Sequence, residues 1–242
     1  MKFLVVKHVV VEGLGVFAPW CAQAGIGLDW VEWERGDTLP DAQGYQAVWV
    51  MGGPMNVTDE AEYPWLALEK QWIRQVVETY QIPYMGVCLG AQLLAVALGG
   101  TVGAMTKPEV GLGPVYLTQL AKQHPLFQGV PERFLALHWH GQEVKTLPPQ
   151  GVLLASSDHC RVQAYAVGEH AFGIQFHAEV EAQTVADWSQ LPAYRAALEQ
   201  VLGPAGCAEL TQTVTAQLPN ITPIAQQLWA NFYQIVRHRW AT

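Results

Sequence analysis

Residues 84–100, YMGVCLGAQLLAVALGG, lie in the longest stretch of the chain without a charged side chain, because no Asp, Glu, Lys or Arg occurs between Glu78 and Lys107. A transmembrane helix needs about 20 consecutive apolar residues. Here Pro83, four glycines and a glutamine interrupt the run. IPYMGV fits a short buried strand and LGAQLLAVAL a buried helix. We therefore expect a strand, a tight turn and a helix, and no membrane segment.

Apolar and amphipathic segments alternate on the amino-terminal side of this unit. FLVVKHVVV, LDWVEW and AVWVMGG have the pattern of buried strands, and VFAPWCAQAG and WLALEKQWIRQVVETY that of helices. This alternation predicts an α/β fold with an open, mostly parallel central sheet and helices on both faces.

The second half of the chain has a different pattern. Between residues 101 and 176 the candidate strands are short and close together (PVYLTQL, RFLAL, VLLASS, VQAYAV and FGIQF). Some should pair as hairpins and give the sheet an antiparallel edge. The tail is helical again, with breaks expected near LGPAG and LPNITP. We expect one domain over residues 1–190 and a C-terminal helical extension, residues 191–242, packed on the same domain.

Composition limits the partners and the compartment. The chain has 242 residues and a net charge of −8, so it offers no basic face to nucleic acid or to an acidic membrane.

The four cysteines contain no C-x-x-C pair, which argues against a disulfide framework and a thiolate metal site. Lys7, His8 and Glu12 interrupt the apolar part of the N-terminal segment MKFLVVKHVVVEGLG, so we expect it to form the first, buried strand and not a signal peptide. These features predict a cytoplasmic protein.

The pentapeptide GVCLG places Cys88 between two glycines. G-x-C-x-G is the cysteine form of the nucleophile elbow, a strained strand-to-helix turn that exposes the reactive atom above the sheet. Gly86 and Gly90 would allow the close approach of backbone that this turn requires. The start of the next helix also favours a thiolate. The alternative is a small buried apolar residue, but the glycine spacing favours a nucleophile.

A thiolate nucleophile needs a base, a residue that orients the base, and donors for an oxyanion. FGIQFHAEV supplies His177 at the end of a short strand, and Glu179 projects to the same side two residues later. The glycines of VWVMGGPMN follow another strand of the same sheet, so the backbone N–H of Gly53 is one candidate donor. The N–H of Leu89, directly after the nucleophile, is the second.

These segments together resemble the class I glutamine amidotransferases, and in particular the amidotransferase domain of GMP synthase and its free-standing relatives. GVCLGAQLLA is similar to the C-x-G-x-Q elbow of the family, FGIQFHAEV to its Q-F-H-x-E block, and MGGPMN to its oxyanion loop. GGTVGAMTKPEVGLGPV, LHWHGQE and LASSDHCRVQAY resemble three further blocks in the same order. The resemblance extends from the first strand to about Trp188.

The resemblance implies a flavodoxin-like fold and a Cys88–His177–Glu179 triad that hydrolyses glutamine to glutamate and ammonia through a γ-glutamyl thioester, without a cofactor. It further implies that Gln92 contacts the substrate and that the backbone near His140 and Gly141 holds its amino-acid end. One departure is HGQE, where relatives often carry an Asp after the Gly, and this leaves the identity of the γ-glutamyl compound open.

Two further motifs could indicate other chemistry. His138 and His140 form an H-x-H pair, but no third ligand lies at a recognisable spacing, so we expect no metal site. Cys160, in the DHC sequence, lacks an elbow and is expected to be inert. Trp139, between the two histidines in a predicted loop, would wall the site.

Four functions remain to be distinguished. A glutamine amidotransferase is the first, and because the chain has no G-x-x-x-x-G-K-[ST] loop, its ammonia would go to a separate synthetase subunit. A γ-glutamyl peptidase with the same triad is the main alternative and needs only a wider pocket. An α/β-hydrolase acting on esters is disfavoured because its acid precedes the histidine in the chain. A binding module without catalysis is disfavoured by the intact triad.

Overall fold

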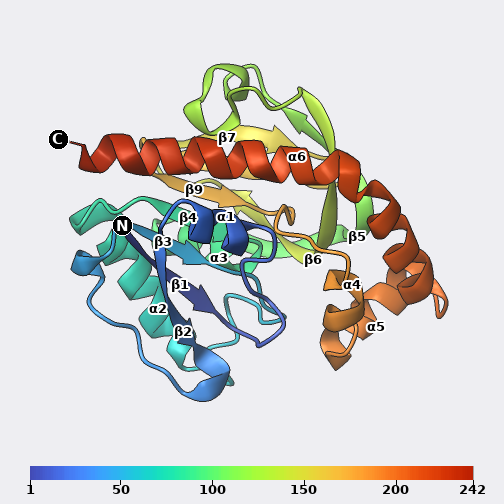
Figure 1. Ribbon diagram of the computed structural model, residues 1–242. Coiled ribbons are helices and arrows are strands. Elements are labelled where there is room, and N and C mark those ends of the chain that lie inside the picture. Colours follow the sequence, from blue (N-terminus) through green and yellow to red (C-terminus); the bar gives the residue numbers. More distant parts are fainter. Residues whose placement is uncertain (242) are drawn as a thin grey trace.

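Within residues 1–241, which the computed structural model describes, nine strands form one open sheet in the order β2-β1-β3-β4-β9-β8-β7-β5-β6 (Figure 1). The strands are β1 (Lys2–Lys7), β2 (Gly27–Glu32), β3 (Ala47–Val50), β4 (Tyr84–Val87), β5 (Thr101–Leu117), β6 (Arg133–Thr146), β7 (Gly151–Ser156), β8 (Ala164–Val167) and β9 (Ala171–Ile174). Strands β2, β1, β3, β4 and β9 pair in parallel, and β8, β7, β5 and β6 pair antiparallel. The predicted α/β class, with a parallel centre and an antiparallel edge, is therefore confirmed.

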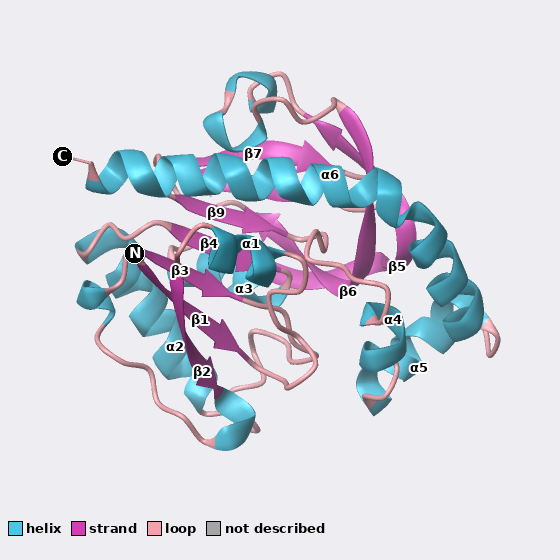
Figure 2. Ribbon diagram, in the orientation of Figure 1, coloured by secondary structure: helices cyan, strands magenta, loops and turns pink. Residues whose placement is uncertain are grey.

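Helices cover both faces of the sheet (Figure 2). They are α1 (Phe17–Gln23), α2 (Trp65–Arg74), α3 (Leu89–Ala97), α4 (Thr184–Trp188), α5 (Pro192–Leu202) and α6 (Gly206–Trp240). Short 3-10 turns occupy Trp33–Arg35, Ala42–Gly44, Ala121–Gln123 and Pro125–Phe127, and a π turn, Gln75–Thr79, extends α2. One apolar core joins α1 and α6 to one face, a second joins α2 and α3 to the other, and a third lies between α4–α6 and β5–β6.

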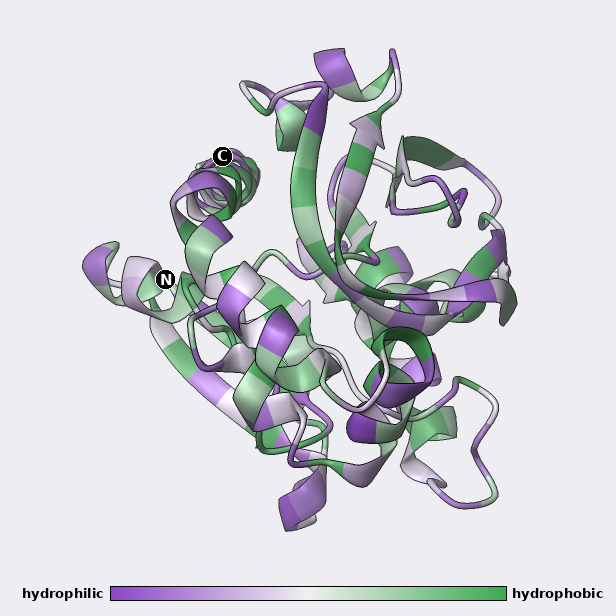
Figure 3. Ribbon diagram, turned by 90° about the vertical axis from the view of Figure 1, so that its right-hand side faces the viewer, coloured by the Kyte–Doolittle hydropathy of each residue, from purple (hydrophilic) through white to green (hydrophobic). Residues whose placement is uncertain are grey.

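The charge-free stretch is divided as the glycines predict. Residues 84–87 form the buried strand β4, and α3 begins directly after Cys88. None of the helices in residues 1–241 combines the length and the apolarity that crossing a bilayer requires. In Figure 3, hydrophilic and hydrophobic residues alternate along the helices at the surface, as expected for helices with one face on the core and one in solvent. Helix α3, in contrast, is buried along nearly its whole length.

Two expectations about element boundaries are wrong. The break expected at LPNITP is absent, because α6 runs continuously through Pro219 and Pro223. Figure 1 shows that α6 bends instead of ending; a proline removes one backbone hydrogen bond and kinks a helix, and packing on the sheet holds the remainder together. Strands β5 and β6 are also much longer than the short segments expected, because they pair with each other almost from end to end.

Candidate active site

Cys88 lies at the turn between β4 and α3. Its φ of 50° and ψ of −105° are unusual for a residue with a side chain, and such strain is held only where the surrounding structure imposes it. A Cβ on Gly86 would overlap the carbonyl of Gly90, and a Cβ on Gly90 would overlap the carbonyl of Val50. The backbone N–H of Cys88 also donates to the carbonyl of Ile174 at 2.8 Å. The two glycines thus allow β3, β4 and α3 to pack closely enough to form this turn.

His177 and Glu179 follow β9, the strand next to β4. Nδ1 of His177 lies 2.6 Å from Oε1 of Glu179, and the His177 N–H donates to the carbonyl of Leu137 at 2.8 Å. Burial lowers the pKa of His177, but the charge of Glu179 and a hydrogen bond to Cys88 outweigh burial and raise it well above 6.5. The three side chains predicted from the sequence are therefore in contact, and the raised pKa of His177 favours a protonated ring beside the sulfur.

A fourth ionisable side chain, Glu12, lies beside them and was not singled out from the sequence. One of its oxygens, a His177 nitrogen and a Glu179 oxygen lie within 4.8 Å of one another, yet neither Glu12 oxygen has a hydrogen-bond partner in residues 1–241. Burial raises the pKa of Glu12 to about 7, with the charge of Glu179 also raising it and His177 lowering it. The only feature of the sequence that could have pointed to Glu12 is its position, an acidic residue between a buried strand and two glycines. The trio could hold a cation, but His177 already uses its nitrogens on Glu179 and Cys88.

A cavity of about 120 Å³ opens at Cys88, and predicted substrate-binding residues surround it. Gly53, Gln92, His140 and Gly141 line this cavity, together with Trp139 and Gln142. Leu89 lies behind Gly53, since a Cβ on Gly53 would come within 2.9 Å of Leu89 Cδ2.

The Gln92 amide is fixed by two acceptors. It donates to Gln175 Oε1 at 3.0 Å and to the carbonyl of Gln142 at 3.3 Å. The Gly53 N–H, in contrast, donates to no acceptor within the part of the chain that the structure describes. Gly53 itself lines the Cys88 cavity.

Helix α5 forms the outer wall of the cavity through Ala193, Tyr194 and Ala197. The Tyr194 carbonyl accepts a hydrogen bond of 3.3 Å from Nε1 of Trp139, and their rings are 5.9 Å apart. Residues beyond position 190 thus reach the site, a role that the sequence did not suggest. Trp139 does wall the cavity, but it stands on strand β6 and not in a loop.

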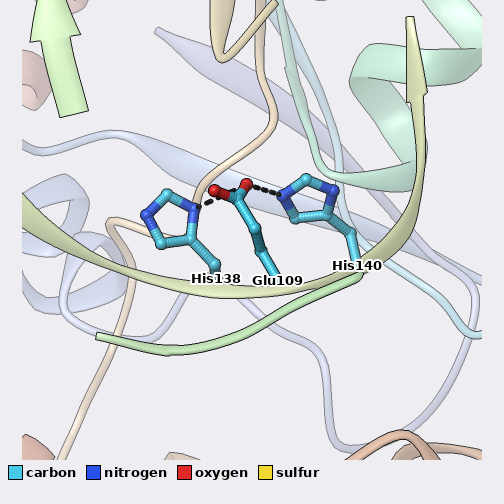
Figure 4. A group of neighbouring side chains, drawn as sticks. All are labelled: Glu109, His138 and His140. Carbon is cyan, nitrogen blue, oxygen red and sulfur yellow. Dashed lines mark ion pairs between the residues drawn. The ribbon is translucent and has the colours of Figure 1, made fainter. Parts of the chain in front are cut away.

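The H-x-H pair has a third partner that no sequence spacing indicated. Figure 4 shows Glu109 of β5 between His138 and His140 of β6, with Glu109 Oε2 3.1 Å from His140 Nε2 and 3.8 Å from His138 Nδ1. Glu109 and His140 are paired in the β5–β6 ladder, although they are far apart in the sequence. The Gln163 amide nitrogen lies among them, 2.7 Å from Glu109 and 3.2 Å from His138.

This arrangement is a hydrogen-bond network in the structure as it stands. A zinc ion would need its ligands at about 2.0–2.2 Å, and the Gln163 amide occupies that space. Burial would raise the pKa of Glu109, but hydrogen bonds from His140 and Ser157 bring it to about 2. Burial lowers the pKa of His138 to about 4. A charged Glu109 therefore anchors His140 against the wall of the cavity.

Comparison with known proteins finds relatives over most of the chain. The family model for "Glutamine amidotransferase class-I" matches residues 21–187. A glutamine amidotransferase-like protein of Salmonella typhimurium is 30% identical over 189 residues, which cover 76% of this chain and 78% of the relative. A glutamine-hydrolysing GMP synthase subunit of Picrophilus torridus is 34% identical over 145 residues, covering 60% of this chain and 71% of the relative.

Solved structures give the same assignment. A glutamine amidotransferase from Thermotoga maritima superposes with a TM-score of 0.85 at 27% identity, covering 98% of both chains. One from Methylobacillus flagellatus, at 24% identity and a TM-score of 0.84, shares the fold. The chain belongs to the class I glutamine amidotransferase family.

Proposed function

We propose that the protein hydrolyses the side-chain amide of glutamine to glutamate and ammonia through a thioester on Cys88. The observation that carries the proposal is the contact of Cys88 with the His177–Glu179 pair at the base of a small cavity. A thiolate beside an imidazolium whose ring is held by a carboxylate is the arrangement that acyl transfer requires.

The reaction would begin with attack of the Cys88 sulfur on the amide carbon. The carbonyl oxygen becomes an oxyanion, which the N–H groups of Gly53 and Leu89 would stabilise. His177 gives its proton to the departing nitrogen as the C–N bond breaks, so ammonia leaves and a thioester remains. The now neutral His177 takes a proton from water, whose oxygen attacks the thioester, and glutamate and the Cys88 thiolate are released.

Pocket size favours glutamine over a γ-glutamyl peptide. The cavity of about 120 Å³ is well below the ~300–1,000 Å³ typical of sites for drug-sized ligands. Ala193, Tyr194 and Ala197 of α5 also line this cavity, which leaves less room for the second residue of a peptide. Gln92, His140 and Gly141 remain to hold the amino-acid end of a single glutamine. Residues 191–242, in this view, act as part of the same domain.

The ammonia would be consumed by a partner. Some relatives are named as subunits of a glutamine-hydrolysing GMP synthase, which suggests that this protein, too, supplies ammonia to a separate synthetase subunit. A cytoplasmic location fits the proposal because all four cysteines are unpaired.

The test is a comparison of substrates. Glutamate release would be measured with glutamine and with a set of γ-glutamyl dipeptides, using the wild-type protein and, as a control, the Tyr194→Ala variant, which widens the cavity. We expect glutamine to be preferred in kcat/KM by at least about tenfold, and Tyr194→Ala to reduce the preference. A wild-type protein that prefers a dipeptide would make the peptidase the better assignment.

A further inference from the structure

A fully buried ion pair lies behind the oxyanion loop, outside the triad. His8 directly follows β1 and Glu69 is on α2, and both side chains are 0% exposed. Burying two charges costs several kcal/mol for each ion, and the pair seldom repays this in stability. Neither side chain is among the residues that line the Cys88 cavity. The pair therefore calls for an explanation other than stability.

The contacts of His8 show what the pair holds. Nδ1 of the ring lies 2.8 Å from the carbonyl oxygen of Gly52, and Nε2 lies 3.2 Å from both oxygens of Glu69. Trp65 stacks on the ring at 5.5 Å, and Nε1 of Trp33 donates to Glu69 at 3.1 Å. These contacts leave the imidazole ring a single orientation.

Both nitrogens of His8 face acceptors. A carbonyl and a carboxylate can only accept hydrogen bonds, so both ring nitrogens donate and the ring carries a proton on each. Burial lowers the pKa of His8, but Glu69 and the bond to Gly52 outweigh burial and raise it. The role of Glu69 is then to keep His8 doubly protonated, so that its Nδ1–H always points at Gly52.

The direction of the Gly52 carbonyl fixes the direction of the next N–H. In a planar trans peptide the C=O and the following N–H point in opposite directions, so a carbonyl held toward His8 turns the Gly53 N–H away from His8. Gly53 and Cys88 line the same cavity. Glycine has wide conformational freedom, and a Gly-Gly peptide could turn over without such a restraint. The Gly53 Cα also packs so closely that a Cβ would lie 3.0 Å from His8 Cβ.

We propose that His8 and Glu69 are positioning residues that clamp the Gly52–Gly53 peptide with the Gly53 N–H aimed at the oxyanion. This inference rests on the proposed function, because it assumes that Gly53 stabilises the intermediate of amide hydrolysis. The clamp acts on the transition state and not on the bound ground state. Its loss should therefore lower kcat and leave KM nearly unchanged.

The experiment compares two double variants that differ only in the donor to Gly52. Removing His8 alone would strand a buried carboxylate, whereas replacing both members of a buried pair with other side chains is often tolerated. His8→Leu/Glu69→Leu removes the clamp. His8→Asn/Glu69→Leu keeps an N–H donor near the position of Nδ1. The His170→Leu variant is the control, because His170 Nε2 also bonds a backbone carbonyl, that of Val77 at 3.1 Å, at the opposite end of the sheet.

We expect the Leu/Leu variant to lose kcat by about 10- to 100-fold, less than the ~10²–10³ of a deleted oxyanion donor. KM should stay within about twofold, since ground-state contacts are kept. The Asn/Leu variant and His170→Leu should retain most of kcat. Alkylation of Cys88 by iodoacetamide, which forms no oxyanion, should be unchanged in all of them. An unaltered kcat in the Leu/Leu variant, or an equal loss in the Asn/Leu variant, would overturn the clamp.

The proposed function would be refuted if the wild-type protein hydrolysed neither glutamine nor a γ-glutamyl dipeptide. Even then, crystal structures of the two double variants would test the clamp. The Gly52–Gly53 peptide should be turned over or present in two orientations in the Leu/Leu variant and unchanged in the Asn/Leu variant. A single, unchanged orientation in the Leu/Leu variant would show that His8 does not hold the peptide.

Discussion

The parallel and antiparallel halves of the sheet contribute to the site in different ways. In the parallel half, Gly53, Cys88 and His177 follow the carboxyl ends of β3, β4 and β9, which lie side by side. In the antiparallel half, Glu109 and His140 meet across two long strands and line or support the wall of the cavity. Under the proposed function, the parallel half would provide the groups for the reaction and the antiparallel half a wall that holds the substrate. Substitutions in the first should affect kcat and those in the second KM.

The largest effect is expected for Cys88→Ala in the parallel half. Removal of the nucleophile should lower kcat by about 10⁶-fold without loss of the fold. Cys160→Ala is the matched control, since Cys160 is also buried and burial raises the pKa of its thiol. Steady-state glutaminase assays and melting curves on both variants measure this, and comparable losses in the two would refute the role of Cys88.

Glu179→Gln should have a smaller but still large effect. The amide can keep the ring of His177 in place but cannot stabilise the imidazolium, so we expect a loss in kcat of about 10⁴-fold. Glu181→Gln, an exposed site two residues further on, serves as the control. A loss as complete as that of Cys88→Ala would mean that Glu179 does more than orient His177.

Glu109→Gln tests the antiparallel half. Without the charge of Glu109, His140 is held less firmly against the cavity, and we expect KM to rise by roughly tenfold, equivalent to ~1.4 kcal/mol, while kcat changes little. Glu132→Gln, which removes an exposed partner of Lys122, should leave KM unchanged. If Glu109→Gln instead lowers kcat with KM constant, the proposed division of roles between the two halves is wrong.

Glu12→Gln should have a larger effect on the pH dependence of stability than on turnover. The pKa of Glu12 is raised from 4.5 to about 7 in the fold, so between these values the folded state binds more protons than the unfolded state. The free energy of unfolding therefore falls as pH rises, by up to about 1.4 kcal/mol per pH unit. Denaturant titrations from pH 4.5 to 8 should show that the free energy of unfolding of Glu12→Gln lacks this decrease with pH. If the free energies of unfolding of the wild-type protein and the variant changed with pH in the same way, the raised pKa of Glu12 would be contradicted.

The residues of the parallel half could be predicted from the sequence, and those that support the site from elsewhere could not. Cys88 between its glycines, and His177 two residues before Glu179, are short motifs whose geometry depends on neighbours in the chain. Their contact follows from the rule that parallel strands present their carboxyl ends at one edge. The alternation of apolar and amphipathic segments was sufficient to predict the fold class, and with these local motifs it was sufficient to predict that the three side chains lie together.

The supporting residues were not predictable in this way. Glu69 meets His8 from 61 positions away, and Glu109 meets His140 across a ladder whose register no local pattern fixes. The continuity of α6 through two prolines and the reach of α5 to the cavity also depend on packing against the sheet. Tertiary contacts, and not sequence spacing, decide these features.

The most direct test of the central claim is the site of covalent modification by an electrophilic glutamine analogue, such as a chloromethyl ketone, located by peptide mass spectrometry. If Cys88 is the nucleophile, we expect rapid modification of Cys88 alone, protection by glutamine, and no modification after Cys88→Ala. Modification of Cys21, Cys160 or Cys207 while Cys88 stays free would contradict the claim.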